Sequence, residues 1–393
     1  MKTCRIHRAP PRVEQGVVRL EAELELPDVQ PYVVFFEYTC PDTAEVRPAM
    51  RPFLLAALVP AMHAGLPLQL DGPLDPVTYA NLMEWQAAYS DWRPRQLRVV
   101  PILSQPEAVS PSTSQKAGGA LTAFSGGVDS CFTVHQQTRP ACPDDVYRRI
   151  PLRAGLMVHG FDIPLEQGAV FESAWQNSVA ILAVFGLQAF RLRTNLRTVG
   201  RACGCDWETE GHGIWLAAAL ACLEPWFDGL VIPSSYPYSR LILPWGSNPV
   251  TDPLLGGAQT PCWHDGAGHN KLTKVLALAA DPTIAARVRV CWQGRQLDRN
   301  CGHCFKCIAT QICFWLAGVP RPAAFPSPCT LAEVARVPVK NQPNDFLLEV
   351  LESRARSQGW PDLASALRCA RTRGRYRRRW TALRRALSQR FFP

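Results

Sequence analysis

Alternating apolar and polar positions predict the first structural elements of this chain. Residues 17–27 carry an apolar side chain at every second position, which is the pattern of a half-buried strand. Residues 32–38 are rich in aromatic and β-branched side chains and predict a second strand. The other elements expected here are a helix at 53–63 with a kink or break at Pro60, a helix at 77–89 and a strand at 96–103. We interpret residues 1–115 as a small α+β domain.

Strand and helix patterns then alternate from about residue 120 to residue 318, and we interpret residues 116–320 as one domain. A polar segment with serine, proline and glycine, residues 104–119, precedes them and is interpreted as a linker. Strands are expected at 121–124, 155–159, 189–192 and 230–233, and helices at 128–137, 166–185 and 210–226. Such alternation predicts an α/β fold with a parallel sheet that carries helices on both faces.

The last part of the chain, residues 321–393, is expected to be helical and ends in a basic tail. Helices are predicted at 344–358 and 360–387. Ten arginines and no acidic residue lie between positions 368 and 393, so the net charge of +9 belongs to this tail. One apolar stripe follows the same helix and consists of Tyr376, Trp380, Leu383, Leu387 and Phe391. The tail could bind RNA, an anionic membrane surface or an acidic protein, or pack on the body of the protein.

Composition narrows the class of protein. With 393 residues, 47% hydrophobic and 19% charged, the chain reads as globular and long enough for two domains. It has no uncharged apolar run of 18 residues, and its N-terminus lacks the apolar region of a secretion signal. We therefore expect a cytoplasmic protein without a transmembrane segment. In that reducing compartment its 15 cysteines are expected to be metal ligands, catalytic groups or buried apolar residues.

The clearest indication of a chemical function is a glycine-rich loop. The sequence SGGVDS at residues 125–130 follows a predicted strand and opens a predicted helix. Glycines allow backbone N–H groups to approach an anion, and a helix N-terminus adds free donors and partial positive charge. Asp129 would repel a phosphate unless a magnesium ion lay between them. The loop predicts a phosphate site formed by Ser125, Gly126, Gly127, Asp129 and Ser130.

This loop resembles the SGG-x-DS loop of the PP-loop ATP pyrophosphatases. The resemblance implies an adenine nucleotide alpha hydrolase-like domain that binds ATP with magnesium. It also implies that a substrate oxygen attacks the α-phosphate, pyrophosphate leaves, and a nucleophile then displaces AMP. The next strand ends at Asp162, which could contact the ribose of ATP or cap the following helix.

Four cysteines predict a metal site. The spacing C-x9-C-G-x-C-x2-C joins Cys291, Cys301, Cys304 and Cys307. Four thiolates without histidine are typical of a closed structural zinc site. An iron–sulfur cluster is the competing interpretation, because such clusters are also held by four cysteines.

The loop and the cysteine spacing together resemble the 7-cyano-7-deazaguanine synthase (QueC-like) group over roughly residues 120–310. The segment Leu272-Thr273-Lys274 resembles a threonine–lysine segment of that group. The resemblance implies a ligase that adenylates a carboxylate and transfers it to nitrogen, which forms an amide or a nitrile. Asp129, Ser130 and Lys274 would then be catalytic, with Lys274 or Lys271 stabilising phosphate charge. A solvated helix face would explain the two lysines equally well.

Other segments depart from that group, which suggests a rebuilt substrate pocket. Gly211-His212 replaces an arginine–asparagine pair, and residues 234–240 and 244–247 replace a purine-reading loop. Candidates for a stacking wall and an anion clamp are Tyr236, Tyr238, Trp245 and Arg240. Candidates for acid–base groups, in what could also be a surface loop, are His264, Asp265 and His269. The substrate is expected to be a small molecule, peptide or protein that bears a carboxylate.

Two other functions stay open at this point. Cys203 and Cys205 could carry a persulfide in a tRNA-modifying sulfurtransferase, or they could be ordinary loop or core cysteines. The chain could also be a non-catalytic nucleotide-binding module. Because the chain shows no glutaminase nucleophile motif, the expected nitrogen donor of the ligase is free ammonia or an amine of a partner.

Overall fold

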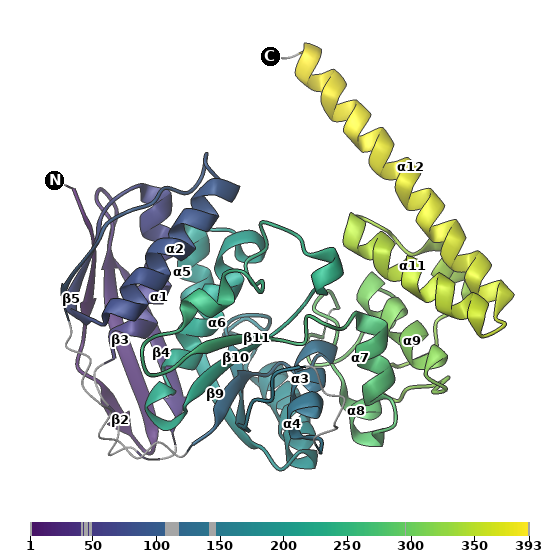
Figure 1. Cartoon of the computed structure of the whole chain (residues 1–393), viewed down its shortest axis with the longest axis horizontal. Coiled ribbons are helices and arrows are strands. Elements are labelled where there is room, and N and C mark those ends of the chain that lie inside the picture. The colour runs from purple at the N-terminus through teal and green to yellow at the C-terminus, as the bar shows by residue number, and fades with distance from the viewer. Residues whose placement is uncertain are drawn as a thin grey trace. The chain divides into compact units, whose positions relative to one another are not determined.

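A computed structural model of the chain describes residues 2–40, 42, 46, 49–106, 118–140, 147–294 and 296–391, with side chains left out at 105, 106 and 382–391. The chain forms two compact units (Figure 1). The first comprises Met1–Ser125 and Thr133–Gly268, and the second comprises Gly126–Phe132 and His269–Pro393. The predicted boundary at residue 115 lies in the segment 107–117, outside the described residues.

The first unit is α/β and contains the predicted parallel sheet. Five consecutive strands pair in parallel: β7 (Ala120–Ala123), β8 (Leu152–His159), β9 (Gln188–Thr194), β10 (Gly229–Pro233) and β11 (Cys262–Asp265). Their spatial order is β9-β8-β7-β10-β11. Counted along the chain this order is 3-2-1-4-5, so the direction in which strands are added reverses between β7 and β10. Sheets with such a reversal bind ligands beside it, at the carboxyl ends of the strands.

Helices cover both faces of these five strands. They are α3 (Val128–Thr138), α4 (Gly168–Val184), α5 (Leu196–Ala202) and α6 (His212–Ala221). Leu121 and Ile232 belong to the buried cluster that includes the apolar residues of α6. On the opposite face, Gly155 leaves room for the Leu182 side chain of α4. Because successive side chains of a strand point to opposite faces, each face of the sheet packs against its own layer of helices.

The N-terminal strands extend the same sheet. They are β1 (Cys4–Arg8), β2 (Arg12–Glu14), β3 (Val17–Glu25), β4 (Tyr32–Thr39), β5 (Leu68–Leu74) and β6 (Ile102–Pro106). Strand β4 pairs antiparallel with β9, with Phe36 opposite Thr194. In the described part of the chain the result is one sheet of 11 strands. The N-terminal part of the chain, interpreted from sequence as a separate domain at residues 1–115, thus contributes strands to the sheet of the first unit.

The strand expected at 96–103 differs most from the structure, because β6 begins only at Ile102. Leu97 and Val100 are buried without belonging to a strand. The side chain of Gln86 takes the place of a strand partner, since its oxygen accepts from the Val100 N–H at 2.9 Å and its amide donates to the Val100 carbonyl at 3.2 Å. A side chain distant in sequence therefore satisfies this backbone. Strand β6 also takes up the first residues of the predicted linker.

Two N-terminal helices, α1 (Arg51–Ala64) and α2 (Pro76–Trp92), pack within the first unit. The break considered at Pro60 does not occur, and α1 continues through this residue. A proline inside a helix costs ~3 kcal/mol or more. The residues of α1 from Arg51 to Met62 are all buried, and burial of so much apolar surface offsets that cost.

The helix expected at 210–226 is split into three pieces. A π-helical turn at Trp207–Gly211 precedes α6, and a short 3₁₀ helix follows at Glu224–Trp226. The carboxylate of Glu210 is fully buried and lies 2.7 Å from His63 Nε2 and 2.9 Å from Arg93 Nε. Both partners come from the N-terminal part of the chain. An ionic contact distant in sequence therefore accompanies the π turn.

The second unit is helical, as predicted for the C-terminal region. Its helices are α7 (Lys271–Leu278), α8 (Pro282–Arg287), α9 (Phe305–Leu316), α10 (Leu331–Arg336), α11 (Gln342–Ser357) and α12 (Pro361–Phe391), and it also holds the first turn of α3. Helix α12 continues past the end of α11 (Figure 1). No helix in the described ranges is long and apolar enough to cross a lipid bilayer.

Gly160, just after β8, gives a test of the carboxyl edge of the sheet. Its φ of +107° is unfavourable for other residues, and an added Cβ would lie 1.9 Å from the Thr194 carbonyl oxygen. We expect Gly160→Ala to lower the free energy of unfolding by more than ~1 kcal/mol, measured by thermal or denaturant unfolding. Gly168→Ala is the matched control, because a Cβ at Gly168 meets nothing within 4 Å. Equal stability of the two variants would contradict this account.

Candidate functional site

The glycine loop begins α3, as the sequence predicts. Gly126 has a φ of +70°, which favours glycine, and its carbonyl accepts from the Arg289 N–H at 2.8 Å. Ser130 is buried and donates its hydroxyl to the Gly127 carbonyl at 3.1 Å. Cys131, the residue that follows the loop, is also buried. The residues of this loop from Gly126 onward belong to the second unit, and Ser125 is the last residue before it.

Asp129 is held by two lysines of α7. Lys274 Nζ lies 2.8 Å from Asp129 Oδ1, and Lys271 Nζ lies 3.9 Å from Oδ2. Burial by itself would raise the pKa of Asp129, but the nearby charges of Lys274 and Lys271 outweigh it and hold the pKa below its ordinary value. Asp129 is therefore a carboxylate at neutral pH. Its side chain is 27% exposed and so can still be reached by a ligand.

Lys274 is one of the largest fully buried side chains of the protein. The side chain of Asn270 caps α7 by accepting from the Thr273 N–H at 3.1 Å, which sets where the helix begins. Lys274 also lies 5.9 Å from the ring centre of Phe132. A buried ammonium is costly unless it is paired. The solvated helix face that the sequence left open therefore does not describe Lys274.

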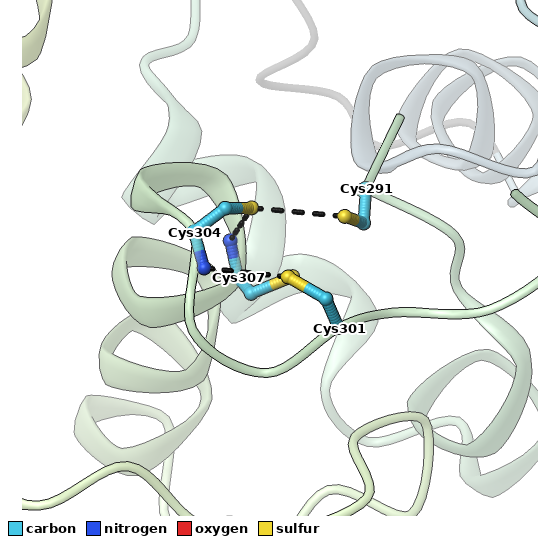
Figure 2. A group of neighbouring side chains, drawn as sticks. All are labelled: Cys291, Cys301, Cys304 and Cys307. Carbon is cyan, nitrogen blue, oxygen red and sulfur yellow. Dashed lines mark hydrogen bonds between the residues drawn. The ribbon is translucent and has the colours of Figure 1, made fainter. Parts of the chain in front are cut away.

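The four predicted metal ligands come together in the second unit. Their Sγ atoms all lie within 4.8 Å of one another (Figure 2). The distances are 3.7 Å for Cys291–Cys304 and 3.8 Å for Cys301–Cys307. A tetrahedron with metal–sulfur bonds of ~2.3 Å has edges of about 3.8 Å. The cluster can therefore hold one metal ion with tetrahedral coordination.

Two buried side-chain amides hold the cysteine-bearing segments in place. Asn300 accepts from the Val290 and Cys291 N–H groups at 2.8 and 3.2 Å, and donates to the Val288 carbonyl at 2.8 Å. Gln311 of α9 donates to the Gly302 carbonyl at 3.1 Å. These bonds hold the segment of Cys291 beside the loop that carries the other cysteines. Sequence reasoning named the cysteines but missed both amides.

Hydrogen bonds polarise the thiols within the cluster. Cys304 Sγ accepts from the Cys307 N–H at 3.5 Å, in the position of a helix N-cap. The Cys307 thiol together with this bond lowers the pKa of Cys304 to about 5, and the same pairing raises the pKa of Cys307. Donation of backbone N–H groups to sulfur is a common support for metal-bound thiolates.

Asp162 and its neighbours lie in the first unit, at the carboxyl ends of β8 and β9. Asp162 is exposed. Arg197 Nη1 donates to the Phe161 carbonyl at 2.5 Å, and its guanidinium lies 4.8 Å from the ring centre of Trp207. Burial lowers the pKa of Arg197, and the charge of Asp162 opposes that shift. An arginine and two aromatic rings therefore accompany Asp162, and the sequence had not pointed to them.

Of the proposed stacking wall, Tyr236 and Trp245 meet edge to face with ring centres 5.2 Å apart. Tyr238 is 59% exposed and Arg240 is exposed in a short 3₁₀ helix, Tyr238–Arg240. The structure thus brings together two members of the set, while the other two side chains lie at the surface.

The histidine stretch is not a surface loop throughout. His264 and Asp265 belong to β11 and are largely buried. His264 pairs with Asp252, and Asp265 Oδ1 accepts from Gln137 at 2.8 Å. His269 belongs to the second unit, where its ring lies 4.7 Å from that of Phe132. Asp252 was missed by sequence reasoning, because an aspartate before a proline is typical of a loop.

The cysteines of the sulfur-transfer alternative are partly or fully buried. Burial raises the pKa of Cys203 to about 11. It raises the pKa of Cys205 further, with smaller effects from Cys203 and Glu210. Both are therefore thiols at neutral pH. Persulfide chemistry requires an accessible thiolate with a lowered pKa, so this environment does not favour it.

The tail arginines whose side chains the structure describes divide between two faces of α12. Four of them pair with acidic residues of α11: Arg368 with Glu352, Arg371 with Asp345, Glu349 and Glu352, and Arg375 and Arg378 with Asp345. Arg373, Arg377, Tyr376 and Trp380 are exposed on α12. The side chains of Leu383, Leu387 and Phe391, predicted to continue the stripe, lie outside the described residues. Part of the positive charge thus stabilises the helix pair.

Comparison of the chain with protein-family models, with curated proteins and with solved structures finds no match.

Proposed function

We propose that the protein is an ATP-dependent ligase of the PP-loop type, similar to the 7-cyano-7-deazaguanine synthase group. It would adenylate a carboxylate, release pyrophosphate, and pass the acyl group to a nitrogen nucleophile to form an amide. To form a nitrile, a second ATP would adenylate the amide oxygen, which then leaves with AMP. The observation that carries this proposal is the glycine loop at the start of α3, whose Asp129 is paired with the buried Lys274. The 3-2-1-4-5 strand order supports it, because the loop directly follows β7, the strand at the reversal.

Each loop residue has a role in this reaction. Backbone N–H groups after Gly126 and the hydroxyls of Ser125 and Ser130 would bind the pyrophosphate portion of ATP. Carboxylate oxygens are preferred ligands of magnesium, and Asp129 offers two of them. A bound magnesium ion would offset the negative charge of the phosphates. Lys274, released from Asp129 as the carboxylate turns to the metal, would stabilise charge on the leaving pyrophosphate.

The first half-reaction would proceed by displacement at phosphorus. A carboxylate oxygen of the substrate attacks the α-phosphorus of ATP, the P–O bond to the pyrophosphate breaks, and an acyl-adenylate forms. Nitrogen then attacks the acyl carbon, and AMP leaves with the C–O bonding electrons. Asp162 is the candidate contact to the ribose. The substrate itself would be a small molecule, a peptide or a protein.

We assign a structural zinc ion to the four cysteines. Four thiolates occupy all four positions of a tetrahedral site, which leaves none for a reacting water. Sulfur–sulfur distances below 5 Å suit a single ion, whereas a four-iron cluster needs its cysteines further apart because each binds a different iron. The site would stabilise the segment that carries Arg289, whose N–H holds Gly126.

Turnover of α-labelled ATP with magnesium tests the proposed function. The wild type is expected to release AMP and pyrophosphate, slowly alone and faster with its carboxylate substrate, and to contain one zinc ion per chain. Release of ADP and phosphate, or no binding of ATP, would exclude a PP-loop ligase. Both the sulfurtransferase and the ligase would form AMP, and Cys203→Ser would inactivate only the sulfurtransferase.

A further inference from the structure

A buried aspartate–histidine pair lies at the carboxyl end of β11. His264 Nδ1 is 2.7 Å from Asp252 Oδ2, and the two side chains are 3% and 0% exposed. His264 pairs in register with Ile232 of β10, whose side chain belongs to the buried cluster on the face of α6. The pair therefore sits on that face of the sheet, at the edge where ligands bind in α/β folds.

The surroundings of Asp252 fix which nitrogen of His264 carries the proton. Asp252 Oδ2 also accepts from the Ser247 hydroxyl at 2.7 Å, and Oδ1 accepts from the Asn248 N–H at 3.2 Å. A carboxylate with these donors accepts from Nδ1–H as well. That tautomer leaves Nε2 with a lone pair. Nε2 is buried and has no hydrogen-bond partner among the described residues.

A structural role accounts for only half of this arrangement. The bond from Nδ1 to Asp252 ties β11 to the loop at residues 244–252 and needs nothing from the second nitrogen. Buried polar atoms nearly always have hydrogen-bond partners, and leaving one unpaired destabilises the fold. A leucine in place of His264, with an apolar neighbour in place of Asp252, would avoid that cost. The unpaired nitrogen is explained if it meets a donor that binds there.

The loop that carries Asp252 is held rigidly. The Gly246 N–H donates to the Glu208 carbonyl at 2.8 Å, and the Gly213 N–H donates to the Gly246 carbonyl at 2.6 Å. The Tyr89 hydroxyl donates to the Trp245 carbonyl at 3.0 Å. Such bracing from α2 and α6 is what a positioned acid–base group requires. The N-terminal part of the chain thus helps to position Asp252, because Tyr89 belongs to it.

We propose that Asp252 and His264 form a general-base pair for the nitrogen nucleophile, an ammonia molecule or a primary amine. This inference rests on the proposed ligase function. As nitrogen bonds to the acyl carbon, one N–H proton passes to His264 Nε2 and AMP leaves with the C–O electron pair. Asp252 is the positioning residue that holds the tautomer and stabilises the imidazolium that forms. Proton transfer of this kind contributes ~100- to 10,000-fold to rates.

The test compares His264→Asn with His264→Leu in the full chain. Asparagine places an amide N–H near the position of Nδ1 and has no atom at Nε2. We therefore expect His264→Asn to unfold near the temperature of the wild type, and His264→Leu clearly below it. If the asparagine variant is as unstable as the leucine variant, Nε2 is needed for folding and the proposal is wrong.

Nitrogen NMR of protein labelled with ¹⁵N-histidine then measures directly whether His264 Nε2 carries a proton. The signals lost in His264→Asn identify His264 among the eight histidines. We expect an unprotonated Nε2 whose resonance shifts in ammonium chloride relative to sodium chloride of equal concentration, and loss of the single tautomer in Asp252→Asn. A protonated Nε2, or equal spectra in the two salts, would overturn the proposal. Because this experiment needs no ATP, its failure is distinct from a failure of the wild type to form AMP.

Discussion

Replacement of Asp129 by asparagine is expected to lower AMP formation from ATP by about 100- to 1000-fold. The substitution removes the one carboxylate of the glycine loop and with it the proposed ligand of magnesium. The measurement is turnover of α-labelled ATP, together with the affinity for ATP in magnesium and in EDTA. We expect the magnesium dependence of binding to disappear in the variant.

Stability has to be separated from chemistry in this experiment. Asparagine leaves the buried ammonium of Lys274 without its carboxylate, and breaking such a pair costs roughly 3–5 kcal/mol. The double variant Asp129→Asn/Lys274→Met removes both charges and is expected to regain stability without regaining AMP formation. Asp91→Asn, at an exposed position of α2, is the matched control and should behave as wild type. AMP formation by Asp129→Asn at the wild-type rate would refute the proposed role of the loop.

The second large effect is expected from loss of one cysteine of the metal site. Cys304→Ser should abolish stoichiometric metal binding, because serine is a poor ligand for zinc and the other three sulfurs form an open site. Structural zinc contributes about 10–16 kcal/mol to the folding of small zinc domains, which exceeds the net stability of most proteins. Even a fraction of that amount would unfold the helices around α9. Metal content and thermal unfolding of the purified variant are the measurements.

The exposed Cys369 of α12 provides the control for this prediction. Cys369→Ser should keep its metal and its unfolding temperature. Treatment of the wild type with a strong chelator should reproduce the effect of Cys304→Ser. Arg289 lies two residues before Cys291, and its backbone N–H donates to the Gly126 carbonyl of the glycine loop. Loss of the metal should therefore also weaken ATP binding. A wild type without metal, or a Cys304→Ser variant as stable as wild type, would count against the structural zinc.

Some elements could be predicted because their signal is local. The alternation at residues 17–27 became β3, Val17–Glu25, since a strand with one buried face needs apolar residues at every second position. The apolar stretches of the central region became β7, β8, β9 and β10; of these, β7 and β10 are buried at nearly every position, as is typical of parallel strands covered on both faces. The cysteine spacing was equally informative, because three ligands within seven residues of chain can meet only in a tight turn.

Other features depended on residues far apart in sequence. The start of β6 at Ile102 depended on Gln86, whose side chain makes the hydrogen bonds of the Val100 backbone that a neighbouring strand would otherwise make. Helix α1 continued through Pro60 because it is buried along most of its length. Strand β11 was missed because its four residues are too few to show a period, and it forms by pairing with β10.

By itself, the sequence determined the glycine loop, the four cysteines and the alternating α/β pattern, because each of these signals lies in residues that are close together in the chain. Only the tertiary structure decided that Lys274 is buried against Asp129 rather than solvated, since the two lie 145 positions apart. It likewise joined Asp252 to His264 and placed the N-terminal strands in the main sheet. The physical reason is that burial and charge pairing are properties of the packed chain. They favour a particular partner only after folding has excluded water from around it.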